Sequence, residues 1–138
     1  MSESIAFAMH NISVDQFAIL GEHLPNDCQI KTEIQIGIDK TNRGVAIRLR
    51  VIYQDSNGNA ILVIQITCMF LVEENDWKTL IDGENKISLP HGFLAHLAMH
   101  TFGTLRGILY CKTSETPLGA IILPPTNIDE LIPQKFVV

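Results

Sequence analysis

The chain has 138 residues, 46% of them hydrophobic, and a formal net charge of -5. Its length and hydrophobic content suit one domain with its own core, so we expect a single domain over residues 1–138. The ten Lys and Arg residues are scattered singly, which argues against the clustered positive charge of a nucleic-acid surface.

Targeting and redox features predict a cytoplasmic protein. The N-terminus lacks the basic and apolar regions of a signal peptide, and apolar runs such as 60–64 are far shorter than the roughly 20 residues that span a bilayer. The three cysteines, an odd number without a CxxC pair, are Cys28, Cys68 and Cys111. We expect reduced cysteines that serve in packing, and no membrane insertion.

Alternating hydrophobicity predicts strands in the first half of the chain. A weak strand candidate over 5–14 is followed by two segments, 29–39 and 45–54, in which hydrophobic and polar residues alternate. This period of two is typical of half-buried strands. Asn57-Gly58 then tolerates the positive φ of a tight turn, so it predicts a hairpin that leads into a third strand.

The third of these strands, predicted over 60–72, differs because both of its faces are largely apolar. Its second face includes four apolar residues, Ile61, Val63, Met69 and Leu71. In an antiparallel sheet this pattern indicates a central strand that is covered on both sides, in part by something outside the chain. We expect these four residues to contact a client or a second subunit. The alternative is that the chain's own segment 76–89 covers them.

Helical periodicity appears only in the second half of the chain. The segment 75–88 holds turn residues and is predicted to be a connecting loop, whereas apolar residues recur at i, i+3 and i+4 over 90–111. That helix is on the order of 33 Å long, enough to cover a small sheet, and Ser88 is its expected cap. A short strand over 118–123 and a last helical turn after Asn127 complete an α+β fold.

Histidines are the first candidates for chemistry. His96 and His100 lie four residues apart on the predicted helix, the spacing that lets two imidazoles share a metal ion. Leu97 stands where a zinc hydrolase helix carries Glu, and the helix holds no carboxylate. For His91, His96 and His100 the sequence therefore favours a structural or surface role, and it predicts no metal site and no cofactor.

Other catalytic groups are equally poorly supported. Cys68 and Cys111 lie in apolar periodic segments rather than beside a base, and the acidic pairs Glu73-Glu74 and Asp129-Glu130 fall in turns and caps. The chain contains neither GxGxxG nor GxxxxGK, the glycine-rich loops that hold phosphates. We expect no catalytic residue and a protein that is not an enzyme.

Two motifs resemble the SecB-type export chaperones. Residues 102–106 read F-G-T-L-R and residues 123–131 read L-P-P-T-N-I-D-E-L, similar to the family's F-x-x-x-R helix and its P-x-N tail with D-x-L. Residues 10–15 are similar to the family's first strand. The resemblance implies a four-stranded antiparallel, Greek-key-like sheet covered by one long helix, with a short C-terminal helix. It also implies a dimer or dimer of dimers that holds unfolded or precursor polypeptides on apolar grooves without nucleotide.

The same resemblance implies roles for single residues. Arg106 matches the family's helix arginine, to which we assign a structural role because a buried guanidinium needs carboxylate or carbonyl partners. Family members dock the motor SecA through an acidic surface, and Asn11 and Ile64 replace two of its acids here. Only Asp15 remains as a docking acid, which argues against SecA as a partner.

Three further interpretations stay open at this point. A SecB-like chaperone could serve one dedicated partner, such as the antitoxin of a toxin–antitoxin system. A hotdog-type acyl-thioester hydrolase also wraps a sheet around a long helix, but its helix comes early in the chain and begins with an acid. The third interpretation is a structural subunit that holds no client.

Overall fold

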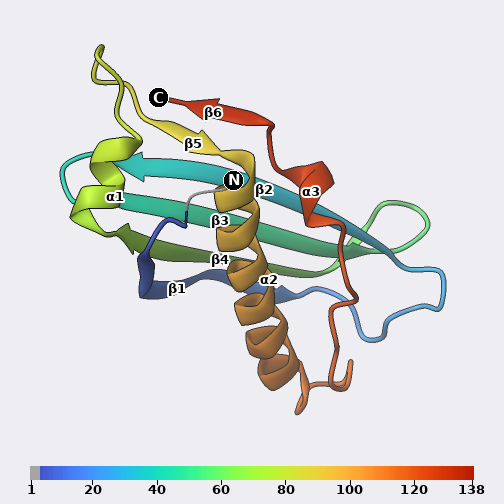
Figure 1. The fold of residues 1–138 in the computed structure, drawn as a ribbon. Coiled ribbons are helices and arrows are strands. Elements are labelled where there is room, and N and C mark those ends of the chain that lie inside the picture. The colour runs from blue at the N-terminus through green and yellow to red at the C-terminus, as the bar shows by residue number, and fades with distance from the viewer. Residues whose placement is uncertain (1–3) are drawn as a thin grey trace.

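The computed structural model describes residues 4–138 and contains one four-stranded antiparallel sheet. Its strands are β1 (Phe7–Ile19), β2 (Gln29–Asp39), β3 (Gly44–Gln54) and β4 (Ala60–Val72), arranged in the order β1-β4-β3-β2 (Figure 1). Strands β2, β3 and β4 form a meander, and β1 lies beside β4. A long connection, 20–28, therefore crosses the end of the sheet, which makes this a Greek-key arrangement as expected.

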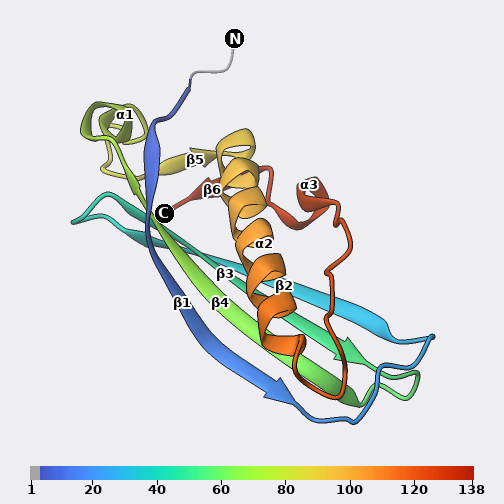
Figure 2. The same ribbon diagram turned by 90° about the horizontal axis from the view of Figure 1, so that it is seen from below.

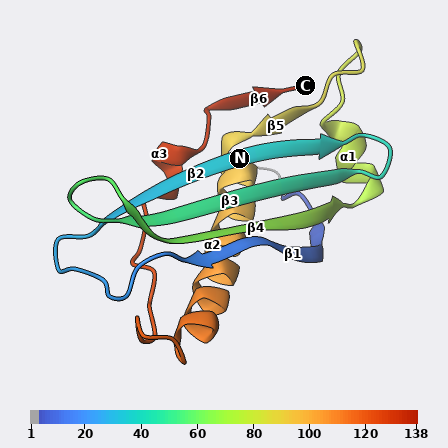
Figure 3. The ribbon, with the colours of Figure 1, turned by 180° about the vertical axis from the view of Figure 1, so that it is seen from behind.

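Every other element lies on one side of the sheet, as Figure 2 shows. These are α1 (Glu74–Thr79), β5 (Ser88–Pro90), α2 (His91–Thr113), α3 (Ile128–Leu131) and β6 (Lys135–Val137), with β5 and β6 paired antiparallel. Seen from behind, the four strands face the viewer with no helix in front of them (Figure 3). The molecule thus has two layers, and among residues 4–138 no helix or further strand covers the outer face of the sheet.

The core lies between the sheet and α2. Alternate residues of the two central strands are buried on the α2 side, from Val45 to Tyr53 in β3 and from Leu62 to Val72 in β4. Helix α2 contributes the other half of the core with Phe93, Leu94, Leu97, Ala98, Phe102, Leu105 and Leu109. This is the i, i+3, i+4 face predicted from the sequence, packed against the period-two face of the strands.

The prediction for residues 75–88 was wrong in part, because this segment begins with a helix. α1 is only six residues long, too short for a visible periodicity. Its N-cap is Glu73, whose carboxylate accepts a hydrogen bond from the Asp76 amide at 2.9 Å. Trp77, Leu80, Ile87 and Leu89 enter the core, so the segment lies on the α2 side of the sheet.

The predicted strand 118–123 was also wrong, since these residues are irregular and pair with no strand. Side chains of α2 bind this segment instead: the Thr113 hydroxyl accepts from the Ile121 amide at 2.9 Å, and Arg106 Nε donates to the Leu123 carbonyl at 2.9 Å. β1 is longer than the predicted 5–14, and Ser88 belongs to β5, while the N-cap of α2 is Pro90. Over residues 4–138, no helix combines the length and apolarity needed to cross a bilayer.

Candidate functional site

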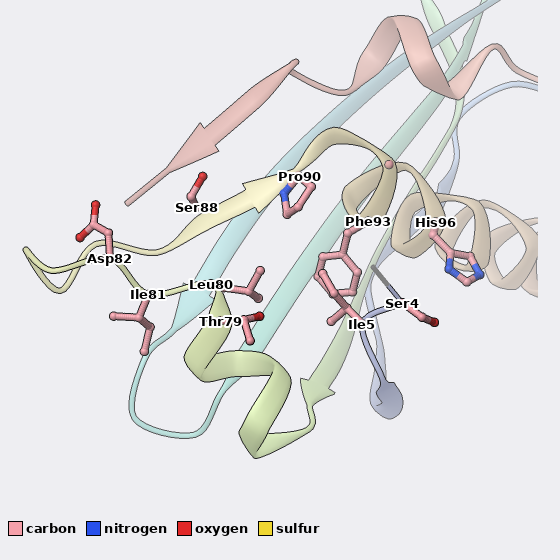
Figure 4. A pocket seen from close by; sticks show the side chains of 11 residues that line it. Ser4, Ile5, Thr79, Leu80, Ile81, Asp82, Ser88, Pro90, Phe93 and His96 are labelled. Carbon is pink, nitrogen blue, oxygen red and sulfur yellow. The ribbon is translucent and has the colours of Figure 1, made fainter. Parts of the chain in front are cut away.

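A pocket of about 780 Å³ opens where α1, α2 and the start of the chain meet. Figure 4 shows its lining, which is largely apolar at the centre and includes Ile5, Leu80, Pro90 and Phe93, with His96 at the edge. Polar lining residues are Ser4, Thr79, Asp82 and Ser88. An apolar hollow with a few polar groups is the usual form of a binding site.

Backbone hydrogen bonds from distant segments hold the walls of this pocket. The Ala6 amide donates to Asp76 Oδ2 at 2.8 Å, which fixes the N-terminal segment against α1. The Ser88 amide donates to the Leu80 carbonyl at 2.9 Å, and the Asp82 carboxylate accepts from two amides of the turn that joins α1 to β5. Three parts of the chain therefore combine to form the pocket.

Apolar side chains are exposed along β1 on the α2 side of the sheet. Met9, Ile12 and Val14 pair in register with core residues of β4, so they point toward the helix layer. They are nevertheless 37%, 46% and 43% exposed, since α2 packs on β3 and β4 rather than on the edge strand β1. Isolated apolar residues at a surface are ordinary, but a row along one strand is typical of a contact surface.

Helix α2 also carries exposed apolar residues. Met99 and Tyr110 are 53% and 47% exposed, and they share a helical face with His96, Gly103 and Gly107. Two contacts show that α2 borders β1 at both ends of the row: the Phe7 ring lies 5.3 Å from that of His96, and Lys112 Nζ lies 5.3 Å from the ring centre of Phe17. We call Met9, Ile12, Val14, Met99 and Tyr110 the β1–α2 strip.

The four residues expected to contact a client or subunit lie on the outer face of the sheet, and they divide into two pairs. Ile61 and Val63 are 6% and 5% exposed. The amides of Leu20 and Gly21 both donate to the Ile61 carbonyl, so the 20–28 connection covers this end of β4. The segment 76–89 lies on the opposite side of the sheet, as described above.

Met69 and Leu71 remain half-buried at the other end of the outer face. They line a hollow of about 510 Å³ together with His10, Asp39 and Arg43. Of these four residues, Met69 and Leu71 are therefore the accessible pair. The contact role of all four residues stays a prediction.

Asp15, the possible docking acid, belongs to a polar row that crosses the outer face. Its carboxylate accepts hydrogen bonds from Ser13 and Thr67 and lies 4.0 Å from Arg48 Nε, and Arg48 also reaches Gln35 of β2. Burial alone would raise the pKa of Asp15, but these hydrogen bonds and the Arg48 charge together lower it. The carboxylate is thus held ionised, with its charge partly balanced within the sheet.

Two other residues singled out in the sequence hold chain segments in place. Arg106 is half-buried and ties α2 to the Leu123 carbonyl. His91 Nδ1 lies 3.1 Å from the Pro133 carbonyl oxygen, and its Nε2 lies 3.3 Å from Asp129 Oδ1. These contacts link the start of α2 to the segment around α3.

Cys68 is a core residue, whereas the remaining pair of histidines is exposed on α2. Cys68 is fully buried in the core, and burial raises the pKa of its thiol, so the thiolate needed for nucleophilic chemistry is disfavoured. The exposed His96 and His100 side chains, in contrast, face each other with 3.3 Å between their Nε2 atoms. The four-residue spacing predicted their proximity, but not their contact with Phe7.

Comparisons with known proteins give a structural likeness only. No protein-family model matches the chain, and no curated protein sequence matches it. A solved structure of the Mycobacterium tuberculosis Rv1957 SecB-like chaperone, in complex with a ChAD peptide from the Rv1956 HigA1 antitoxin, has a TM-score of 0.54 and 12% identity. It covers 88% of this chain and 91% of that chain.

A second solved structure is a protein of unknown function from Streptococcus agalactiae, with a TM-score of 0.48 and 10% identity. It covers 89% of this chain and 100% of that chain. At such low identity a likeness extends to the fold and no further. Taken with the sheet order and the long helix, the first comparison shows that this chain has a SecB-like fold.

Proposed function

We propose that the protein is a holding chaperone, which binds unfolded or extended polypeptide segments without nucleotide. The observation that carries this proposal is the set of exposed apolar side chains of the β1–α2 strip, together with the apolar pocket at the start of α2. His96 lines the pocket and shares a helical face with Met99 and Tyr110, so the two surfaces adjoin. The similar SecB-like chaperone was solved with a bound peptide, which supports the same class of ligand here.

The chemistry of the strip suits a reversible, sequence-tolerant contact. Two of its five side chains are methionines, whose flexible thioethers adapt to irregular apolar partners. Full burial of one large apolar side chain contributes about 1.5–3 kcal/mol, and these five are already half covered. Several client side chains must therefore engage together, and an extended segment can supply them at regular intervals along β1.

We further propose that the chain assembles as a dimer or a dimer of dimers. In the part of the chain that the structure describes, no strand pairs with the outer edge of β1 or of β2. Gly103 and Gly107 lie on the exposed face of α2, where an added Cβ would meet no atom within 4 Å. Unpaired edges and an open helix face are both surfaces that a second copy can cover.

We also propose contact residues on the outer face of the sheet. Met69 and Leu71 are accessible enough to contact a client or a second copy, whereas Ile61 and Val63 require the 20–28 connection to move. Docking to SecA is not included, because Asp15 is engaged with Thr67 and Arg48.

The test is an aggregation assay with a chemically denatured model protein diluted into buffer without ATP. We expect the wild-type protein to suppress light scattering at a few chains per client. A variant with Met9, Ile12 and Val14 changed to Ser should lose most of this effect, since it removes the β1 half of the strip. Ile30→Ser is the matched control, because Ile30 is 38% exposed on the α2 side of the opposite edge strand.

Two outcomes contradict the proposal. If the wild-type protein leaves aggregation unchanged, it does not hold unfolded clients. If the triple variant remains as active as the Ile30→Ser control, the β1–α2 strip is not the client surface. Failure with general clients but binding to one particular peptide indicates a chaperone dedicated to that partner.

A further inference from the structure

Two imidazoles on the exposed face of α2 lie in a geometry that suits a metal ion. His96 and His100 are both exposed, and their Nε2 atoms are 3.3 Å apart. Zn²⁺ binds imidazole nitrogen at about 2.0–2.1 Å with tetrahedral angles, which places two nitrogen ligands roughly 3.3 Å from each other. The observed separation matches that of two ligands of one zinc ion, and it also suits a hydrogen bond between the two rings.

The rings are held in this arrangement from outside the helix. Phe7 of β1 meets both rings edge-on, with centroid distances of 5.3 Å to His96 and 5.7 Å to His100. Phe7 itself packs edge-to-face against Phe70 and Phe93 of the core. Because the packed sheet limits the movement of Phe7, the two imidazoles are partly preorganised, which lowers the entropy lost when they chelate an ion.

Apart from Phe7, each ring's polar partner is the other imidazole. In the absence of metal, one neutral imidazole can donate its Nε2 proton to the other. Chelation needs the lone pairs of both Nε2 atoms, with the protons on Nδ1, so a change of tautomer in one ring suffices and no net proton is released. Among residues 4–138, no third His, Cys, Asp or Glu completes the site. The other coordination positions are thus open to water.

We propose that His96 and His100 form a two-histidine site for a divalent transition-metal ion, Zn²⁺ in the first place, at the edge of the apolar pocket. Imidazole suits Zn²⁺, Cu²⁺ and Ni²⁺, while Mg²⁺ and Ca²⁺ prefer oxygen ligands. His96 also lines the pocket, so a bound ion lies beside the apolar surface and can coordinate a further group there. This site does not depend on the holding function proposed above.

The test is isothermal titration of tag-free protein with ZnCl₂, combined with equilibrium dialysis and metal analysis. We expect one zinc ion per chain, or one per two chains where a second copy completes the tetrahedral shell. His96→Ala and His100→Ala should each weaken binding by at least about tenfold, because each removes one of two ligands. Both positions are exposed and Ala favours helix, so the variants should remain folded.

His23→Ala is the matched control, since it removes one exposed histidine from the 20–28 connection. It should leave zinc affinity unchanged, and MgCl₂ should give no binding at the same concentration. Zinc binding that persists in the His96→Ala/His100→Ala double variant overturns the proposal. So does a wild-type protein that takes up no zinc at millimolar ZnCl₂.

Discussion

Carboxylate side chains organise the tight turns of this protein. Asp39 accepts hydrogen bonds from the amides of Thr41 and Asn42 and from the Asn42 side chain, at 2.8–3.2 Å. Asp55 does the same for the turn that leads into β4, and Asp82 for the turn after α1. These side chains replace backbone partners that the chain lacks where it reverses direction.

The Asp39 turn predicts a pH-dependent stability. Hydrogen bonds from the side chain and then the amide of Asn42, and from Thr41, outweigh burial and lower the pKa of Asp39 in the folded state. Its contribution is therefore fully present above the unfolded-state pKa of about 3.9, and it is lost as the pH falls further through the folded-state value. Asp39→Asn should lower the free energy of unfolding at pH 7, with a difference from wild type that shrinks below about pH 4.

Urea denaturation from pH 7 to pH 3 measures this difference. Asp27→Asn is the control, because it removes the same charge from an exposed position in the 20–28 connection. If Asp39→Asn destabilises the protein by the same amount down to pH 3, the negative charge of the Asp39 carboxylate does not contribute to stability.

At the scale of elements, long amphipathic segments were predictable and short ones were not. The strands 29–39, 45–54 and 60–72 and the helix over 90–111 agree with β2, β3, β4 and α2 to within a few residues. Each of them repeats its period often enough to identify the buried face. α1 and β6 contain six and three residues, so they contain too few periods to be recognised.

The segment 118–123 failed for a different reason. Ile121 and Leu123 are buried and Ile122 between them is exposed, as in a strand, but two polar contacts to Thr113 and Arg106 take the place of a neighbouring strand. Most of the candidate site could not be predicted from the sequence either. The spacing indicated His96 and His100. The pocket, in contrast, depends on Ser4 and Ile5, and the β1–α2 strip depends on residues of β1, all of which lie more than 70 positions before α2 in the chain.

The two glycines of α2 give a prediction at the element scale. An added Cβ at Gly103 or Gly107 would enter open space, and Ala is favoured over Gly within a helix by roughly 1 kcal/mol. Gly103→Ala and Gly107→Ala should therefore each stabilise the isolated chain by about that amount in urea denaturation. If a second copy packs closely on this face, the same changes should weaken the assembly.

Light scattering coupled to size exclusion measures the second effect, with Gly83→Ala as control because Gly83 also has open space but lies in a turn. A stabilised chain whose mass in solution is unchanged would show that the glycines serve no contact between copies.

Residues 4–138 form two layers with one closed core between them. The α2 side of the sheet is filled over β3 and β4 and exposed over β1, and the outer face is polar across its middle because of the row from Asp15 to Gln35. Five exposed large apolar side chains thus lie along β1 and on the exposed face of α2. Client binding and assembly, as proposed, draw on the same region.

This overlap predicts that the two processes compete. An extended apolar peptide should bind more weakly as the protein concentration rises, since assembled chains bury part of the β1–α2 strip. Titrations of a labelled peptide at micromolar and at hundred-micromolar protein should give different apparent affinities. Identical affinities in both, with a mass that changes between them, would place the client and the second copy on separate surfaces.

The position of β1 in the sheet has a consequence for how the protein folds. Strands β2, β3 and β4 are joined by short turns, whereas Phe7 pairs with Val72 and Ile19 with Leu62, across 65 and 43 residues of sequence. Closing a long loop costs more entropy than closing a short one, so the meander should form first and β1 should dock late. Until β1 docks, β4 is a free strand edge with exposed backbone hydrogen-bonding groups. A newly made chain is therefore itself prone to aggregate at this stage and is a possible client of a chaperone.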